Sequence, residues 1–261
     1  MKKLYFIILT HLFFYSCIDI IIDQEFYESI HLQNSGWFEF YENNQNEKLQ
    51  FAAESNSSIQ IWFSGEEQLG EIAPCILNIK GENNELSIYR TLNTNNKISI
   101  YLNDELLQIV EQELIDFNNE KEFYLLTASI NNAQFILYLN NTILLENPIS
   151  WSDAYSYQVG ANFNQNNEAI NLWYGYIDEI RLWAISLTQE IIDFHYQNPY
   201  KVSSSYTDEY LDSLVGLWDF QINTSGEDPA YIFQDINDYE MYTILYTSNI
   251  EAYNELSLNG R

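Results

Sequence analysis

Residues 171–198 read NLWYGYIDEIRLWAISLTQEIIDFHYQN, and this stretch decides the fold. In residues 173–183 apolar and charged side chains interleave, which is typical of a half-buried strand; its apolar members include Ile177, Ile180 and Leu182. A helical spacing follows at Leu187, Ile191 and Phe194. The stretch therefore predicts a strand that leads directly into one short helix near residues 187–196.

Polar residues at both ends of this helix have structural interpretations. Ser186, with Gln189 three residues later, predicts a capping box at the start of the helix. His195 near its end is expected to cap the helix C-terminus or to pack. In the preceding strand, Glu179 and Arg181 share a face and are expected to pair.

Short strand-like runs recur along the rest of the chain. They lie at residues 36–41, 48–52, 58–63, 76–79, 85–89, 97–102, 106–110, 122–130, 134–139 and 142–145, with a further strand at 215–220. Turns rich in Asn and Gly separate them, and Asn131-Asn132 and Asn140-Asn141 are suited to tight hairpins because Asn tolerates positive φ. About ten short strands and one brief helix predict an all-β jelly-roll sandwich of two antiparallel sheets.

Composition indicates one domain with a large core and an acidic surface. Of the 261 residues, 46% are apolar and 16% aromatic, which is enough to bury a sizeable core. Residues 35–261 are expected to form a single domain, because residues 201–261 are too few for a second sandwich and are expected to complete the first. The formal charge of −28 disfavours binding to nucleic acid and to anionic membrane faces.

The N-terminus predicts export. Residues 1–17 combine two lysines, an apolar stretch and Ser16-Cys17, as in a signal peptide that ends in a lipobox. Acylation of Cys17 would tether the protein to the outer membrane or cell surface by a lipid anchor; secretion after signal removal and a retained N-terminal anchor are the alternatives. Residues 18–34 form a tether or a first strand. Cys75, the other cysteine, is expected to be a buried thiol.

Four segments together resemble the laminin-G-like, concanavalin A-like jelly-roll family. GYIDEIRLW at 175–183, followed by LTQEI at 187–191, is similar to the closing strand and helix of that family. Residues 123–141 resemble its hairpin, SIQIWF at 58–63 its early Trp strand, and GLWDF at 216–220 its Gly-Tyr-Trp-x-Phe segment. The resemblance implies a jelly roll whose loops bind a ligand.

Calcium is the cofactor that acidic side chains near these motifs would favour. Asp178, Asp219 and Asp235 are the candidate ligands, since carboxylate oxygens suit calcium. The glycine-rich Asp-x-Ser-Gly-x-Gly loop of the family is missing after Trp218, however. For Asp178 a structural hydrogen-bonding role is the stronger expectation.

Catalytic patterns are missing from the sequence. Glycoside hydrolases of this fold carry Glu-x-Asp-x-x-Glu on one strand, and no Glu-x-Asp occurs in this chain. Asp178 and Glu179 are neighbours on a strand and would point to opposite faces. The sequence therefore favours a protein that is not an enzyme.

Aromatic and amide side chains between the hairpin and the closing strand are the candidate ligand-binding residues. Rings stack on apolar sugar faces, and amides orient hydroxyls; the candidates are Trp151, Tyr155, Tyr157, Asn162, Asn164 and Trp173. The sequence thus predicts a non-catalytic surface or envelope recognition module that binds a glycan or a protein partner. A ligand-free structural envelope protein and a divergent glycoside hydrolase are the alternatives.

Overall fold

The computed structural model describes the body of the chain. The described residues are 30–33, 36–42, 47–65, 73–91, 97–110, 122–131, 134–149, 151–199, 201–203, 209–218, 230–234 and 241–247. The predicted signal peptide, Cys17, Asp219 and Asp235 lie outside them, so export, acylation and those two calcium ligands remain predictions.

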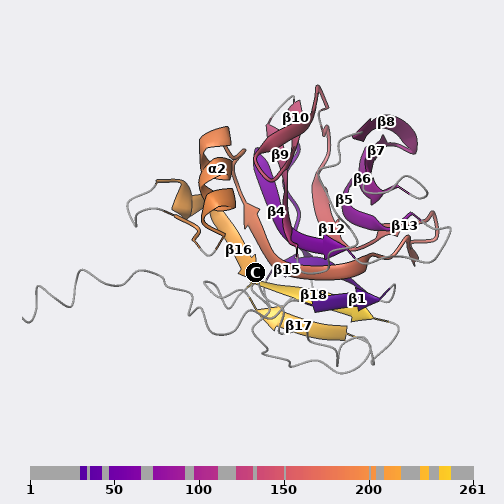
Figure 1. Cartoon of the computed structure of the whole chain (residues 1–261). Helices are drawn as coiled ribbons and strands as arrows, with labels where there is room; N and C mark the ends of the chain where they lie inside the picture. The colour runs from indigo at the N-terminus through magenta and orange to yellow at the C-terminus, as the bar shows by residue number, and fades with distance from the viewer. Residues whose placement is uncertain are drawn as a thin grey trace, which may run out of the picture.

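Two antiparallel sheets pack face to face (Figure 1). The smaller sheet has the order β1-β15-β4-β9-β10-β11, with β16 also paired to β15. Its strands are β1 (Ile30–Gln33), β4 (Ser57–Gly65), β9 (Tyr124–Asn131), β10 (Gln134–Leu139), β11 (Thr142–Asn147), β15 (Tyr174–Trp183) and β16 (Leu214–Trp218). The predicted all-β class and the jelly-roll sandwich are confirmed.

The larger sheet has the order β17-β18-β2-β12-β5-β6-β7-β8, with β3 paired to β2. Its strands are β2 (Gly36–Glu42), β3 (Glu47–Lys48), β5 (Cys75–Gly81), β6 (Glu85–Arg90), β7 (Ile98–Leu102), β8 (Glu105–Val110), β12 (Tyr155–Val159), β17 (Ala230–Gln234) and β18 (Met241–Thr247). A separate hairpin, β13 (Asn162–Phe163) with β14 (Ala169–Ile170), follows β12. Strands β16, β17 and β18 near the C-terminus thus contribute to both sheets.

The closing strand β15 organises the smaller sheet. It pairs with β4 along its length, while β1 and then β16 occupy successive parts of its other edge. Gly175 is required where β15 meets β4, because a Cβ there would lie 2.2 Å from the carbonyl oxygen of Ser64. The register shifts between Ile177 and Ile180, so Asp178 and Glu179 lie at an irregularity rather than in a regular ladder.

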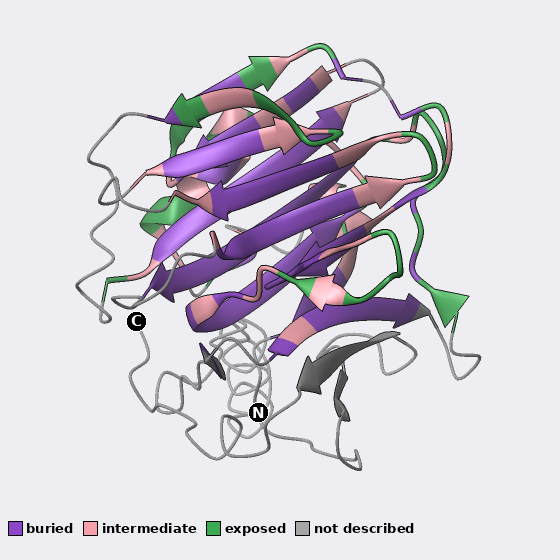
Figure 2. Ribbon diagram, turned by 90° about the vertical axis from the view of Figure 1, so that its right-hand side faces the viewer, coloured by how far each residue is buried: buried purple, intermediate pink, exposed green. Residues whose placement is uncertain are grey.

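Strand alternation fills the space between the sheets with apolar side chains. Ile59, Ile61 and Phe63 of β4 belong to this core, and so do Tyr155, Tyr157 and Val159 of β12 in the other sheet. Figure 2 shows buried strands through the centre of both sheets and exposed residues at loops and edges. The predicted hairpin turn at Asn140-Asn141 is also confirmed: it joins β10 to β11, and Asn140 has a φ of 56°. The predicted turn at Asn131-Asn132 lies partly outside the described residues.

A helix covers the outer face of the smaller sheet. Helix α2 (Gln189–Gln197) packs with β16 over a second apolar cluster that includes Trp183, Leu187 and Ile192. The predicted capping box is wrong: the N-cap is Thr188, and it makes no side-chain capping bond. Ser186 instead bonds to Ser129 (2.8 Å), because the helix begins two residues later than the box requires. Among the described residues, no helix is long and apolar enough to cross a bilayer.

Candidate functional site

A row of polar side chains crosses the outer face of the larger sheet. On β12, Tyr155, Tyr157 and Val159 face the core, so Ser156 and Gln158 between them face outward. The strand registers place Gln158 beside Glu39 of β2 and beside Asn78 of β5. Polar residues on neighbouring strands of a twisted sheet therefore converge at one place.

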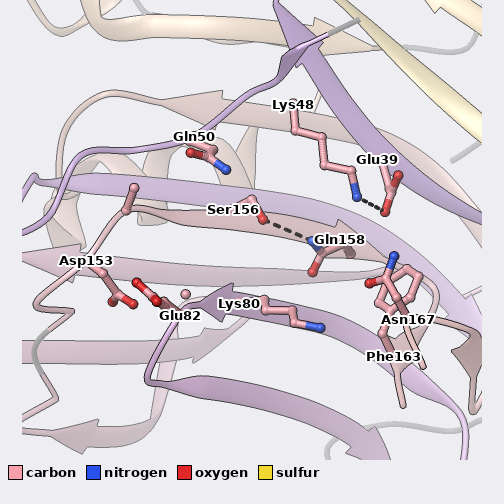
Figure 3. Close-up of a pocket in the computed structure, with 12 residues that line it drawn as sticks. Glu39, Lys48, Gln50, Lys80, Glu82, Asp153, Ser156, Gln158, Phe163 and Asn167 are labelled. Atoms are coloured by element: carbon pink, nitrogen blue, oxygen red, sulfur yellow. Dashed lines mark hydrogen bonds and ion pairs between the residues drawn. The ribbon is translucent and has the colours of Figure 1, made fainter. Parts of the chain in front are cut away.

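A pocket of about 410 Å³ opens where this row meets the β13–β14 hairpin (Figure 3). A volume of this size suits a small-molecule ligand. The lining is mainly polar and comes from β2, β3, β5, β12 and β13, from residues just after β3 and β5, from the loop before β12 and from the turn between β13 and β14. Its residues are Glu39, Lys48, Gln50, Lys80, Gly81, Glu82, Asp153, Ala154, Ser156, Gln158, Phe163 and Asn167.

One wall of the pocket contains the ion pair of Glu39 with Lys48, in which each charge is balanced by the other. Glu39 accepts hydrogen bonds from Lys48 Nζ at 2.7 Å and from the Tyr41 hydroxyl at 2.8 Å. Both carboxylate oxygens of Glu39 are thereby engaged. This wall offers shape and a hydrogen-bonding edge, and its charges largely cancel.

The floor of the pocket holds polar atoms that have no partner in the part of the chain that the structure describes. Gln158 is only 3% exposed, and its Nε2 donates to Ser156 Oγ at 3.0 Å while its Oε1 accepts nothing. Asp153 accepts from Asn83 through Oδ2, and its buried Oδ1 is likewise unpartnered. Buried acceptors without donors are costly, so both are prepared for hydroxyl or amine groups of a ligand.

The opposite end of the pocket combines a cation with an aromatic ring. Lys80 Nζ lies 5.7 Å from the ring centroid of Phe163, and it makes no ion pair with any described residue. Figure 3 shows the Lys80 side chain extending toward Phe163 and Asn167, away from Glu82 and Asp153. The pocket is therefore polarised, with acceptors at one end and a cation at the other.

Local hydrogen bonds hold the hairpin that carries Phe163 and Asn167. Asn164 Oδ1 accepts the backbone N–H groups of Asn166 (2.9 Å) and Glu168 (3.0 Å), which closes the tip. At the base, Asn162 donates to the Tyr89 hydroxyl at 2.7 Å and accepts from Asn171 at 2.9 Å. The predicted candidates Asn162 and Asn164 thus shape the pocket from behind and do not line it.

The four predicted aromatic candidates are buried in the core. Trp151, Tyr155, Tyr157 and Trp173 are at most 3% exposed. The hydroxyls of Tyr155 and Tyr157 both contact Ser57 Oγ, at 2.7 and 2.6 Å, and burial raises the pKa of both. A ring enclosed by the core cannot stack on a ligand, so these residues form no aromatic rim.

The pocket takes part of its lining from the stretch that holds the predicted candidates, but from other residues of that stretch. Asp153, Ser156, Gln158, Phe163 and Asn167 all line the pocket, and all lie between Ser150 and Trp173. The signal was present in the alternation of β12: if Tyr155 and Tyr157 face inward, the residues between them face outward.

The described residues hold no group of three or more His, Cys, Asp or Glu side chains that could bind a metal. Asp178 is buried in β15 at the register shift. Its neighbour Glu179 accepts a hydrogen bond from Arg181 Nε, so the predicted pairing is confirmed, although the pair is buried. Calcium ligation by Asp178, Asp219 and Asp235 together stays a prediction, since the last two lie outside the described residues.

The predictions for His195 and Cys75 are also settled by burial. His195 stacks on Trp183 (5.4 Å between centroids), and its Nε2–H donates to the Val202 carbonyl at 2.9 Å, which confirms a packing role. Burial, together with the nearby Arg181 charge, lowers its pKa to about 3. Cys75 is a buried free thiol, and burial raises its pKa.

Comparison with known proteins supports the fold. No family model and no curated protein sequence matches the chain. A candidate carbohydrate binding protein from Bacteroides ovatus superposes with a TM-score of 0.55 at 10% identity, over 85% of this chain and 60% of that protein. The chain therefore spans less than two thirds of that protein's length.

Two further solved structures are similar at lower scores. A heptameric SAP-like pentraxin from Limulus polyphemus gives a TM-score of 0.45 at 10% identity, over 83% of this chain and 97% of the pentraxin. Domains LG4-5 of the mouse laminin α1 chain give 0.39 at 14% identity, over 60% and 41% of the two chains. The topology described above, together with the likeness to the Bacteroides ovatus structure, gives the chain a jelly-roll fold of two antiparallel sheets.

Proposed function

We propose that this protein is a glycan-recognition module and that the pocket on the outer face of the larger sheet is its binding site. The observation that carries the proposal is Gln158, a nearly buried amide on the pocket floor whose Oε1 accepts no hydrogen bond from the described residues. A buried acceptor of this kind gains its bond when a ligand donates one.

The chemistry of the pocket fits a sugar. Sugar hydroxyls can donate to Gln158 Oε1 and Asp153 Oδ1, and the Phe163 ring at the rim offers a face for stacking. Asn167 adds an amide at the same end. Polar groups at fixed positions around one aromatic surface are what orients a carbohydrate. The Bacteroides ovatus protein of similar fold, itself described as a candidate carbohydrate binder, is in keeping with this proposal.

Binding without hydrolysis is part of the proposal. A glycosidase needs two carboxyl groups, one as an acid and one as a nucleophile or base. Glu39 already accepts from Lys48 and Tyr41, and Asp153 accepts from the Asn83 backbone and side chain. These bonds hold both carboxylates in place as hydrogen-bond acceptors, which suits binding more than proton transfer. We place the module at the cell envelope or outside the cell, as the N-terminal segment predicts.

A glycan array with matched variants tests the site. The wild type is expected to bind a subset of glycans without releasing reducing sugar from them. Gln158→Leu, which removes the amide at nearly constant size, is expected to weaken that binding at least about tenfold, the equivalent of about 1.4 kcal/mol.

Gln134→Leu is the control, because Gln134 lies on β10 of the other sheet and bonds there to Glu146. It is expected to bind as the wild type does. Absence of binding to every glycan, or equal binding by wild type and Gln158→Leu, would count against the pocket as a glycan site.

A further inference from the structure

We infer that the pocket takes a sugar acid, whose carboxylate is bound by Lys80 while its hydroxyls donate to Gln158 and Asp153. The inference rests on the proposed glycan site and adds the class of sugar. It follows from a difference between the two lysines that line the pocket: Lys48 forms an ion pair with a carboxylate of the protein, and Lys80 forms none with a described residue.

Lys48 and Lys80 lie in the same pocket and differ in their partners. Lys48 Nζ is 2.7 Å from Glu39, which satisfies its charge inside the protein. Lys80 Nζ has only the Phe163 ring beside it among the described residues. An ammonium group that lies over a ring and makes no ion pair is a ready donor for an incoming anion.

The charge balance of the chain makes an unpaired lysine unexpected. Acidic residues number 38 and basic residues 10, so a lysine on this surface meets carboxylates far more often than other cations. The net charge of −28 does not prevent an anion from binding at Lys80, because salt screens exposed charges beyond about 8 Å. The local arrangement then decides what the pocket attracts.

The acidic residues of the pocket are positioned so that they do not oppose a carboxylate at Lys80. Glu39 is paired with Lys48, and Asp153 and Glu82 lie at the end from which Lys80 points away (Figure 3). Gln158 lies between the two ends. A ligand with one carboxylate and several hydroxyls matches this order, since carboxylates need donors and hydroxyls can supply protons to acceptors.

Paired monosaccharides isolate the carboxylate. Methyl glycosides of glucuronic, galacturonic and mannuronic acid are compared with those of glucose, galactose and mannose, which differ from them only at C6. Binding to the full chain is measured by ligand-observed NMR and calorimetry. At least one acid is expected to bind about tenfold or more tightly than its neutral counterpart, and the preference is expected to fall as salt is raised.

Three variants test whether Lys80 causes the preference for the acid over the neutral sugar. Lys80→Gln is expected to reduce the affinity for the acid to that for the neutral sugar, with the neutral sugar unaffected. Lys80→Arg is expected to retain the preference. Lys97→Gln changes the net charge equally, and Lys97 does not line the pocket, so it should behave as wild type.

The outcomes separate the two proposals. Equal affinity for acids and neutral sugars, or a Lys80→Gln variant that keeps the preference, overturns the sugar-acid inference and leaves a glycan site standing. An equal loss for Lys97→Gln also overturns it, because the effect would then be general charge. Binding of none of the six glycosides overturns the inference, and the glycan array then decides the fate of the site itself.

Discussion

The outer faces of the two sheets carry similar polar residues that differ in whether the chain satisfies their hydrogen bonds. On the smaller sheet, Ser58, Gln60 and Thr127 are covered by the chain itself, and Gln60 bonds to both Thr127 and Trp183. Ser58 Oγ also accepts a hydrogen bond from the backbone N–H of Leu187. On the larger sheet, Gln158 Oε1 and Asp153 Oδ1 are also buried, but they have no hydrogen-bond partner among the described residues.

The two cations at these faces make the contrast concrete. Arg181 is 1% exposed, pairs with Glu179, and donates to the carbonyls of Pro199 (2.6 Å) and Lys201 (3.2 Å). It fixes the segment that follows α2. Lys80 has none of these contacts. Residue type alone therefore does not determine whether a cation of this fold is satisfied internally; the difference lies in whether the chain supplies the partners.

The largest expected effect on stability comes from replacing the cation of each face with methionine. Arg181→Met should lower the free energy of unfolding by about 3–5 kcal/mol, because it leaves Glu179 buried without its counter-charge. Lys80→Met should change it by less than about 0.5 kcal/mol. Urea denaturation of both variants measures the difference, and equal losses would abolish the distinction between a closed and an open face.

A double variant sharpens the origin of that loss. Glu179→Gln with Arg181→Met removes both charges, so it should recover part of the stability lost in the single variant. No recovery would mean that Arg181 acts through the Pro199 and Lys201 carbonyls and that its charge pairing is secondary.

Acid should weaken the closed face through His195. Its folded pKa of about 3 lies below its ordinary 6.5, so the unfolded chain binds the extra proton first as pH falls. The stabilisation is complete above about pH 6.5 and is lost on going down toward pH 3, by at most about 1.4 kcal/mol per pH unit. Urea denaturation between pH 7 and 5 should show a steeper decline for wild type than for His195→Gln. Parallel curves would exclude this histidine as the cause.

The smallest expected effect tests the core tyrosines. Tyr157→Phe removes a hydroxyl that contacts Ser57 at 2.6 Å, and should cost about 1 kcal/mol of stability. Glycan binding should be unchanged, because the ring faces the core. Weakened binding with unchanged stability would show that the β12 tyrosines serve the ligand after all.

The sequence predicted the scaffold more fully than the site, for a physical reason. Periodicity and turn residues act locally, so the strands, the Asn140 turn and the helix after β15 could be found from short windows. The capping box failed because Ser186 is used by Ser129, a residue 57 positions away.

The pocket depends on register between distant strands, which no single window contains. Gln158 meets Glu39 and Asn78 only because β12 lies between β2 and β5. The four candidate rings were wrongly predicted to be exposed, because aromatic residues are equally common in a hydrophobic core and at a sugar-binding surface. Alternation along β12 could have shown that Tyr155 and Tyr157 face the core. The ion pair of Lys48 and the lack of one at Lys80 could not have been predicted from the sequence.

The hairpin β13–β14 has a consequence for how this scaffold can diversify. Its tip is closed by Asn164 through bonds within residues 164–168, and it contributes Phe163 and Asn167 to the pocket. Neither sheet depends on the tip for its ladder. Its length and side chains are therefore free to vary between related proteins while the sandwich stays constant, so that ligand preference can evolve by exchange of a few residues.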